Sequence, residues 1–113
     1  MIKKIAIGAD HAGVEYKQPL IQYLESKGYE IVNVGTDTTD AVDYPIYAKK
    51  VCEEVTSGRV DTGILICGTG IGMSMMANKQ KGIRAAVCGD TKSAEFTRLH
   101  NDANVLCMGA RII

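Results

Sequence analysis

The sequence has no excess of charge of either sign and no long apolar run. Thirteen Lys and Arg residues balance thirteen Asp and Glu residues, so the net charge does not favour nucleic acid or an anionic membrane surface as a partner. No apolar stretch approaches the roughly 20 residues that a membrane-spanning helix needs. The chain opens Met-Ile-Lys-Lys without a signal-peptide pattern. We therefore expect a cytoplasmic protein.

The four cysteines form no C-x-x-C pair, which argues against a structural zinc site and suits a reduced compartment. Cys52, Cys88 and Cys107 lie in apolar surroundings and are expected in the core. The sequence also lacks repeats, linkers and low-complexity segments. Its 113 residues are expected to form one domain, residues 1–113, large enough for its own core.

Short runs rich in Ile, Val and Ala alternate with helical patterns along the whole chain. Continuous apolar runs of this kind are typical of parallel strands covered on both faces. The order βαβαβαβαβ predicts a three-layer α/β/α Rossmann-like sandwich with a five-stranded parallel sheet. The expected strands are Lys4–Ala9, Glu30–Val34, Thr62–Cys67, Arg84–Cys88 and Asn104–Met108, and the expected helices are Glu15–Lys27, Tyr44–Ser57, Ile71–Lys79 and Lys92–Leu99.

Capping residues support these helices. Asp43 precedes Tyr44-Pro45 and is a good N-cap with proline in the first turn. Asp90 or Thr91 can cap the fourth helix. Pro19 fits the first helix if that helix begins near Tyr16, because the first N–H groups of a helix have no partner to lose.

The third strand runs into a cysteine and then into three glycines at alternate positions, Cys67-Gly68-Thr69-Gly70-Ile71-Gly72. A strand–helix turn of this kind presents backbone N–H groups to an anion. The positive field there favours the thiolate form of Cys67. The alternatives are a tight turn without a ligand and a cysteine that is only a small buried apolar residue.

Two phosphate-binding motifs are excluded at this turn. The dinucleotide fingerprint fails because Met73 occupies the position of the third glycine. The P-loop fails because no Gly-Lys-Ser or Gly-Lys-Thr follows. The turn therefore suits an anion smaller than a dinucleotide.

Polar residues at other strand ends can complete a site, because ligands gather at the carboxyl ends of the strands in open α/β sheets. Asp10 and His11 follow the first strand. Asp10 can also act only as a turn residue, but the neighbouring His11 favours a functional role for the pair.

His100 and Asn101 follow the expected fourth helix. A histidine there can simply stabilise the helix dipole. Since that helix runs back across the sheet, His100 is expected near the amino ends of the strands, away from Cys67. A two-fold dimer could bring His100 of one chain to Cys67 of the other.

Several motifs together resemble the ribose-5-phosphate isomerase type B family, which includes the galactose-6-phosphate isomerases. The resemblance covers the whole chain. The matching stretches are Gly8-Ala9-Asp10-His11-Ala12-Gly13, Asp43-Tyr44-Pro45, Cys67-Gly68-Thr69-Gly70-Ile71-Gly72, Asn78-Lys79, Gly82-Ile83-Arg84-Ala85, His100-Asn101-Asp102-Ala103-Asn104-Val105-Leu106 and Gly109-Ala110-Arg111.

The resemblance implies that ribose 5-phosphate and ribulose 5-phosphate interconvert through a cis-enediolate, without metal or cofactor. It implies a homodimer, or a dimer of dimers, with active sites shared between subunits. Cys67 would move the proton between C1 and C2, His100 would assist ring opening, and Asp10 would hold the hydroxyls of that step. It also places Thr69 in the catalytic set, and Asp10, His11, Gly68, Thr69, Gly70, Ile71, Gly72, Asn101 and Arg111 in the substrate-binding set.

One branch of the family has a glutamate where this chain has Met73, so the role of base falls on Cys67. The galactose-6-phosphate isomerase subunits tend to lack the intact Cys-Gly-Thr-Gly motif, which favours the ribose substrate. The alternatives are an isomerase of a six-carbon sugar phosphate such as allose or galactose 6-phosphate, and a non-catalytic phosphate-binding module. A thiol redox sensor has little support, because no resolving cysteine lies near Cys67 in the sequence.

The resemblance also implies a further helix and a basic tail after Arg111, whereas the printed sequence ends at Ile113. If the protein ends there, we expect weak phosphate binding and poor turnover, because charge-assisted contacts would be lost. If residues are only missing from the printed sequence, we expect an ordinary enzyme.

Overall fold

A computed structural model describes residues 2–35 and 44–113. It confirms the predicted five-stranded parallel sheet, with the strand order β2-β1-β3-β5-β4. The strands are β1 (Lys4–Ala9), β2 (Glu30–Gly35), β3 (Thr62–Cys67), β4 (Ala85–Val87) and β5 (Val105–Gly109), and the helices are α1 (Val14–Ser26), α2 (Tyr44–Thr56), α3 (Ile71–Ala77) and α4 (Thr91–Asn101).

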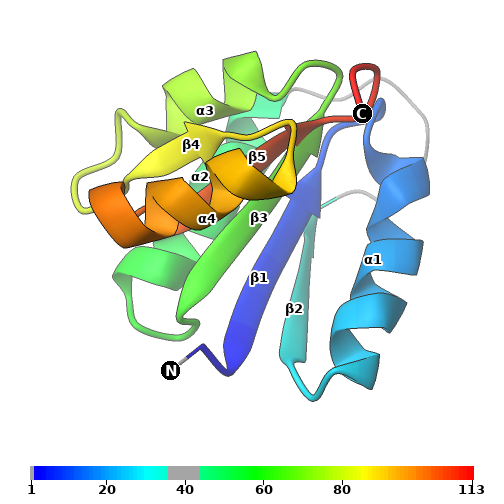
Figure 1. The fold of residues 1–113 in the computed structure, drawn as a ribbon, viewed down its shortest axis with the longest axis horizontal. Coiled ribbons are helices and arrows are strands. Elements are labelled where there is room, and N and C mark those ends of the chain that lie inside the picture. The colour runs from blue at the N-terminus through cyan, green and yellow to red at the C-terminus, as the bar shows by residue number, and fades with distance from the viewer. Residues whose placement is uncertain (1, 36–43) are drawn as a thin grey trace.

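Helices cover the sheet on both sides, which gives the three predicted layers (Figure 1). α1 lies over β1 and β2, and α4 lies further along the same face, where Ala94 and Thr97 approach Ile64 and Leu106. α2 and α3 cover the opposite face. All strands run in one direction, so their carboxyl ends meet at the edge of the sheet where the C-terminus lies in Figure 1.

The apolar core is divided by the sheet, because successive side chains of a strand point to opposite faces. On β3, Ile64 and Ile66 pack beneath α1, whereas Leu65 and Cys67 pack toward α2 and α3. Leu65 and Ile66 are almost completely buried, and each such side chain contributes about 1.5–3 kcal/mol relative to exposure. The central strand that carries Cys67 is therefore firmly anchored on both faces.

The start of α1 differs from the prediction. The helix begins at Val14, so Pro19 is its sixth residue and not part of its first turn. Proline removes the hydrogen bond to the carbonyl four residues earlier, which is that of Glu15. Glu15 and Pro19 are both exposed, so water can satisfy the freed carbonyl on the outer side of the helix.

The last helix and the edge strand also differ from the prediction. α4 extends to Asn101, so His100 and Asn101 form its last turn and do not follow it. The predicted N-cap Asp90 is confirmed, since its carboxylate accepts a hydrogen bond from the Ser93 N–H at 2.7 Å. Asp43 lies outside the described residues. β4 is only three residues long.

A side chain takes the place of a neighbouring strand at the start of β4. Asn78 donates from Nδ2 to the carbonyl of Ala85 and accepts from the Ala85 N–H at Oδ1, at 2.9 and 2.8 Å. This pair of bonds satisfies one residue of the free edge of the sheet. Over the described part of the chain, no helix is long and apolar enough to cross a membrane.

Candidate active site

The turn between β3 and α3 closes on the sulfur of Cys67. The Gly70 N–H donates to Cys67 Sγ at 3.0 Å, and the Ile71 N–H donates to Thr69 Oγ1 at 3.2 Å. Gly70 has φ +81°, a conformation that glycine adopts without strain. Two of the N–H groups in the predicted anion cradle are therefore hydrogen-bonded within the turn itself.

The segment after β5 is locked against this turn. The Ala110 N–H donates to the carbonyl of Cys67 at 2.7 Å, and the Arg111 N–H donates to that of Gly68 at 2.9 Å. A Cβ at Gly109 would come within 2.5 Å of the Thr69 carbonyl oxygen. The backbone contact brings the Arg111 guanidinium over Gly68, 3.4 Å from where a Cβ of that glycine would lie.

The loop between β1 and α1 is the third loop of the site, beside the turn after β3 and the segment after β5, and Asp10 stabilises it. Its Oδ1 accepts hydrogen bonds from the N–H groups of Ala12 and Gly13, at 2.8 and 3.2 Å, and its own N–H donates to the Ile66 carbonyl at 3.1 Å. Asp10 thus acts as a turn residue, which was the alternative to the functional role that the sequence favoured. A Cβ at Gly13 would lie 2.5 Å from the Ile66 carbonyl oxygen, so this loop also packs backbone to backbone.

These three loops surround a cavity of about 240 Å³. Asp10 and Arg111 both line it, together with the turn that follows Cys67. A carboxylate can accept hydrogen bonds from hydroxyls, and an arginine can bind a phosphate. The cavity therefore suits a small polar anion that also carries hydroxyl groups. Its lining residues are Asp10, Cys67, Gly68, Thr69, Gly72 and Arg111.

His11 directly follows Asp10, which lines the cavity, and is half-buried. Its Nδ1 atom is buried and has no hydrogen-bond partner among the described residues. Buried polar atoms are nearly always hydrogen-bonded, so Nδ1 is an atom that a ligand could satisfy.

Cys67 differs from the other three cysteines in its surroundings. All four are buried free thiols, but only Cys67 lines the cavity. Burial raises the pKa of Cys107 to about 12, with a further contribution from Cys67, and burial raises the pKa of Cys52 to about 11. The pKa of Cys88 is also raised, by burial and by the charge of Asp90. These three are core thiols, as predicted.

The structure does not bring His100 and Asn101 to the cavity. Both lie in the last turn of α4, which leads into the amino end of β5. Asn101 lines a separate hollow of about 320 Å³ together with Asn78, Arg84 and Ala85, the first residue of β4. Within one chain the predicted site is therefore divided between the two ends of the sheet.

Arg84 lies in one of the matching motifs, but the sequence predicted no role for it. Its Nε donates to the carbonyl of Asn101 at 2.6 Å. The contact joins residues 17 positions apart, and no local pattern of charge or apolarity could have signalled it. For metals, the described residues contain no group of three or more His, Cys, Asp or Glu side chains that could hold an ion.

Comparisons with known proteins identify the family of this chain. Residues 5–113 match the ribose/galactose isomerase family. Ribose-5-phosphate isomerase B of Escherichia coli K12 is 48% identical over 112 residues, which are 99% of this chain and 75% of that protein. A putative sugar phosphate isomerase of Bacillus subtilis is 52% identical over 97% of this chain and 74% of its own length.

The fold leads to the same family. The structure of ribose-5-phosphate isomerase B from Clostridium thermocellum superposes with a TM-score of 0.95 and 49% identity, over 97% of this chain and 74% of that one. These matches extend along nearly the whole sequence and include all the loops of the cavity. The chain belongs to the ribose/galactose isomerase family.

Proposed function

We propose that this protein interconverts ribose 5-phosphate and ribulose 5-phosphate, the activity that the names of several relatives state. The observation that carries the proposal is the position of Cys67. Cys67 lines a small cavity together with Asp10, which carries a carboxylate, and Arg111, which carries a guanidinium. A base, a group for the sugar hydroxyls and a group for an anion are thus available to one small substrate.

The proposed reaction moves one proton between two carbons. Cys67, as thiolate, removes the proton from C2 of the open-chain aldose, and the electron pair shifts to give a cis-enediolate. The proton returns to C1, and the hydroxyl proton passes from O2 to O1, so that C1 becomes CH2OH and C2 becomes the ketone. A positioned base of this kind contributes about 10²–10⁴-fold. Backbone N–H donors aimed at the developing oxyanion are worth about 3–4 kcal/mol each.

The remaining residues bind and open the sugar. Asp10 uses Oδ1 for the N–H groups of its own turn, and Oδ2 is assigned to the sugar hydroxyls. Arg111 and His11 are assigned to the substrate, His11 because its Nδ1 is buried without a partner among the described residues. Thr69, Gly68 and Gly72 are assigned to the enediolate, since the Gly70 N–H already binds Cys67 Sγ.

His100 and Asn101 are assigned to the site of a second copy of this chain. α4 exposes Phe96 and Leu99, which are 46% and 68% exposed, and the Phe96 ring lies 5.4 Å from the ring of His100. Apolar side chains beside a polar candidate residue are typical of a surface that association covers. Because a two-fold interface is reciprocal, it would complete two sites at once.

Two other functions compete with this one. An isomerase of allose or galactose 6-phosphate would use the same groups on a longer sugar. A phosphate-binding module would use Arg111 and the glycine turn but would not need a thiol at position 67.

The deciding experiment offers the three sugar phosphates separately to the purified protein and follows the aldose and ketose signals by NMR. We expect the largest kcat/KM for ribose 5-phosphate. Faster turnover of a six-carbon sugar phosphate would favour the first alternative. Binding of ribose 5-phosphate by calorimetry with no turnover of any substrate would contradict the isomerase proposal and favour the binding module.

A further inference from the structure

Arg84 reaches from the loop before β4 to the end of α4. Its Nε donates to the carbonyl of Asn101 at 2.6 Å, and Asn101 is the last residue of the helix that carries His100. We propose that Arg84 is a positioning residue, which orients the turn of His100 and Asn101 for use in the site of a second chain. This inference rests on the proposed function, because it assumes that these two residues act on the substrate.

Both backbone hydrogen-bonding groups of Arg84 are paired with Asn104. Its N–H donates to Asn104 Oδ1 at 2.8 Å, and its carbonyl accepts from the Asn104 N–H at 2.9 Å. Asn104 Nδ2 also donates to the Gly82 carbonyl at 2.9 Å. These bonds fix the backbone of Arg84 beside the start of β5. The hydrogen bond from its guanidinium to Asn101 then fixes the end of α4 relative to β5.

The end of α4 depends on polar contacts of this kind. α4 buries none of its side chains, so packing against the sheet does little to fix it. The chain reverses at Asp102, where φ is +51°, and the N–H groups of Asp102 and Ala103 return to the carbonyls of Arg98 and Thr97. These bonds satisfy earlier carbonyls of the helix, whereas Arg84 binds that of Asn101 itself.

The charge of Arg84 is also suited to this place. The carbonyl groups at the end of a helix carry partial negative charge, and a cation there is stabilising. A bond from a charged donor is stronger than one between neutral groups. Arg84 can thus hold the carbonyl of Asn101 although its side chain is exposed to water.

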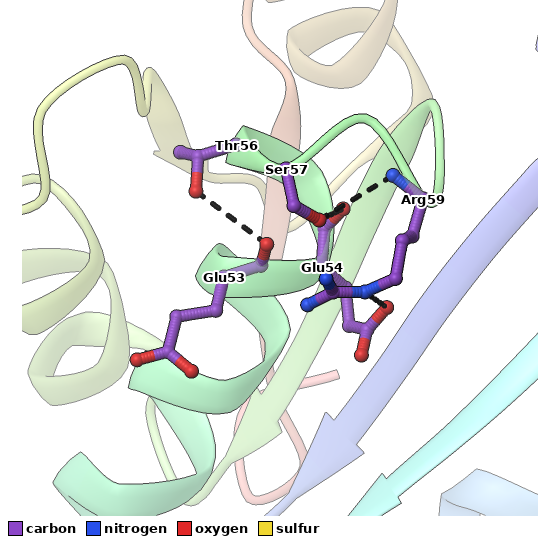
Figure 2. Close-up of polar contacts among 5 residues, drawn as sticks. All are labelled: Glu53, Glu54, Thr56, Ser57 and Arg59. Atoms are coloured by element: carbon purple, nitrogen blue, oxygen red, sulfur yellow. Dashed lines mark hydrogen bonds and ion pairs between the residues drawn. The ribbon is translucent and has the colours of Figure 1, made fainter.

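Arg59 provides a matched control. It too is exposed and donates one short hydrogen bond from Nε, to Glu54 Oε2 at 2.8 Å. Figure 2 shows this pair at the end of α2, with Glu54 in the last turn of the helix and Arg59 in the loop after it, near Glu53, Thr56 and Ser57. Its partner, the carboxylate of Glu54, lies five positions away in the sequence. Glu54 is not one of the candidate site residues. Loss of Arg59 removes a similar bond without touching α4.

The test compares Arg84→Met, Arg84→Lys and Arg59→Met in the full chain, each with and without His100→Ala. We expect Arg84→Met to lower kcat for ribose 5-phosphate roughly tenfold or more, since small displacements of positioned groups are costly. Arg84→Lys should recover part of the loss, and Arg59→Met should change nothing. In the His100→Ala background, Arg84→Met should have a smaller further effect, because the part of its action that passes through His100 is already lost and only the part through Asn101 remains.

Amide hydrogen exchange gives a second readout that does not need activity. Arg84→Met should speed exchange at the N–H groups of Asp102 and Ala103, whereas Arg59→Met should not. Unchanged kcat and unchanged exchange, or an equal loss of kcat in both backgrounds, would overturn the proposal. If the wild-type protein turns over no sugar phosphate, the proposed function fails, and the exchange result still shows whether Arg84 orders the turn.

Discussion

The two ends of the sheet hold their candidate residues in different ways. At the carboxyl ends, backbone packs on backbone, and glycines fill positions where a Cβ would lie 2.5–3.0 Å from a neighbour, as at Gly13, Gly70 and Gly109. At the amino ends, His100 and Asn101 lie on a helix with no buried side chain, whose end is held by two backbone hydrogen bonds and by the side chain of Arg84. The loops at the carboxyl ends, which we call the rigid end, are fixed by close backbone contacts within one chain. By contrast, α4 at the amino ends has no buried side chain.

The largest effect is expected from removing the thiol at the rigid end. Cys67→Ala should lower kcat for ribose 5-phosphate by about 10²–10⁴-fold, because the base is lost, while the fold stays intact. Steady-state kinetics and circular dichroism measure the two quantities.

Cys107→Ala is the control for this substitution. Cys107 is a buried thiol of the neighbouring strand, with its pKa raised to about 12 by burial. Its loss should cost about 1–2 kcal/mol of stability by leaving a small cavity, with kcat unchanged. Similar kcat values for the two variants would show that Cys67 is only a core residue.

A smaller effect is expected from one methyl group in the turn. Gly70 and Gly58 both have φ +81°, so alanine at either position costs roughly 1–2 kcal/mol in backbone strain. A Cβ at Gly58 meets nothing within 4 Å, whereas one at Gly70 would lie 3.0 Å from the backbone of Met108. Gly70→Ala should therefore destabilise the protein more in urea unfolding and also lower kcat.

Gly58→Ala should leave kcat unchanged, which separates general strain from damage to the site. If Gly70→Ala has full activity, the turn accommodates the added methyl group beside Met108 without displacing the site. The loops at the rigid end would then tolerate an added side chain, which would contradict the claim that close backbone packing fixes them.

The smallest effect is expected at the amino end, from a carboxylate that ties strands together. Asp61 accepts hydrogen bonds from the N–H groups of Lys3 and Lys4, at 2.8 and 2.9 Å. The bond from Lys4 and then that from Lys3 hold the pKa of Asp61 below its ordinary value of 3.8. A lowered pKa in the folded state stabilises the fold above the unfolded pKa, and this stabilisation is lost as the pH falls through the folded pKa.

Asp61→Asn should therefore lower the unfolding temperature slightly at pH 7, and the difference from wild type should shrink below pH 4. Its kcat should not change. A difference that persists at pH 2.5 would show that the amide is a poor steric replacement and that charge is not the cause.

The sequence predicted the rigid end well, because that end is built from local motifs. The strand Thr62–Cys67, the glycine turn and the bounds of β1 follow from apolar runs and from glycine spacing. α1 begins at Val14, one residue before the predicted Glu15, and Pro19 lies beyond the first turn in which it was expected, at a position exposed to water.

The amino end was predicted less well, because its contacts join distant residues. The hydrogen bonds between Arg84 and Asn101 and between Asn78 and Ala85 depend on the strand order β3-β5-β4. Local patterns of residues in the sequence do not predict that order. The buried Lys17 also gave no signal by its residue type. It lies on the same face of α1 as the buried Ile21, four positions later.

The central claim is that one site takes Cys67 from one chain and His100 from another. The most direct test mixes Cys67→Ala chains with His100→Ala chains after co-refolding and measures turnover of ribose 5-phosphate. Each hybrid dimer would contain one site with both residues, so a random mixture should regain about one quarter of wild-type activity. Activity no higher than that of the two parent variants, in hybrids verified by native mass spectrometry, would contradict the shared site.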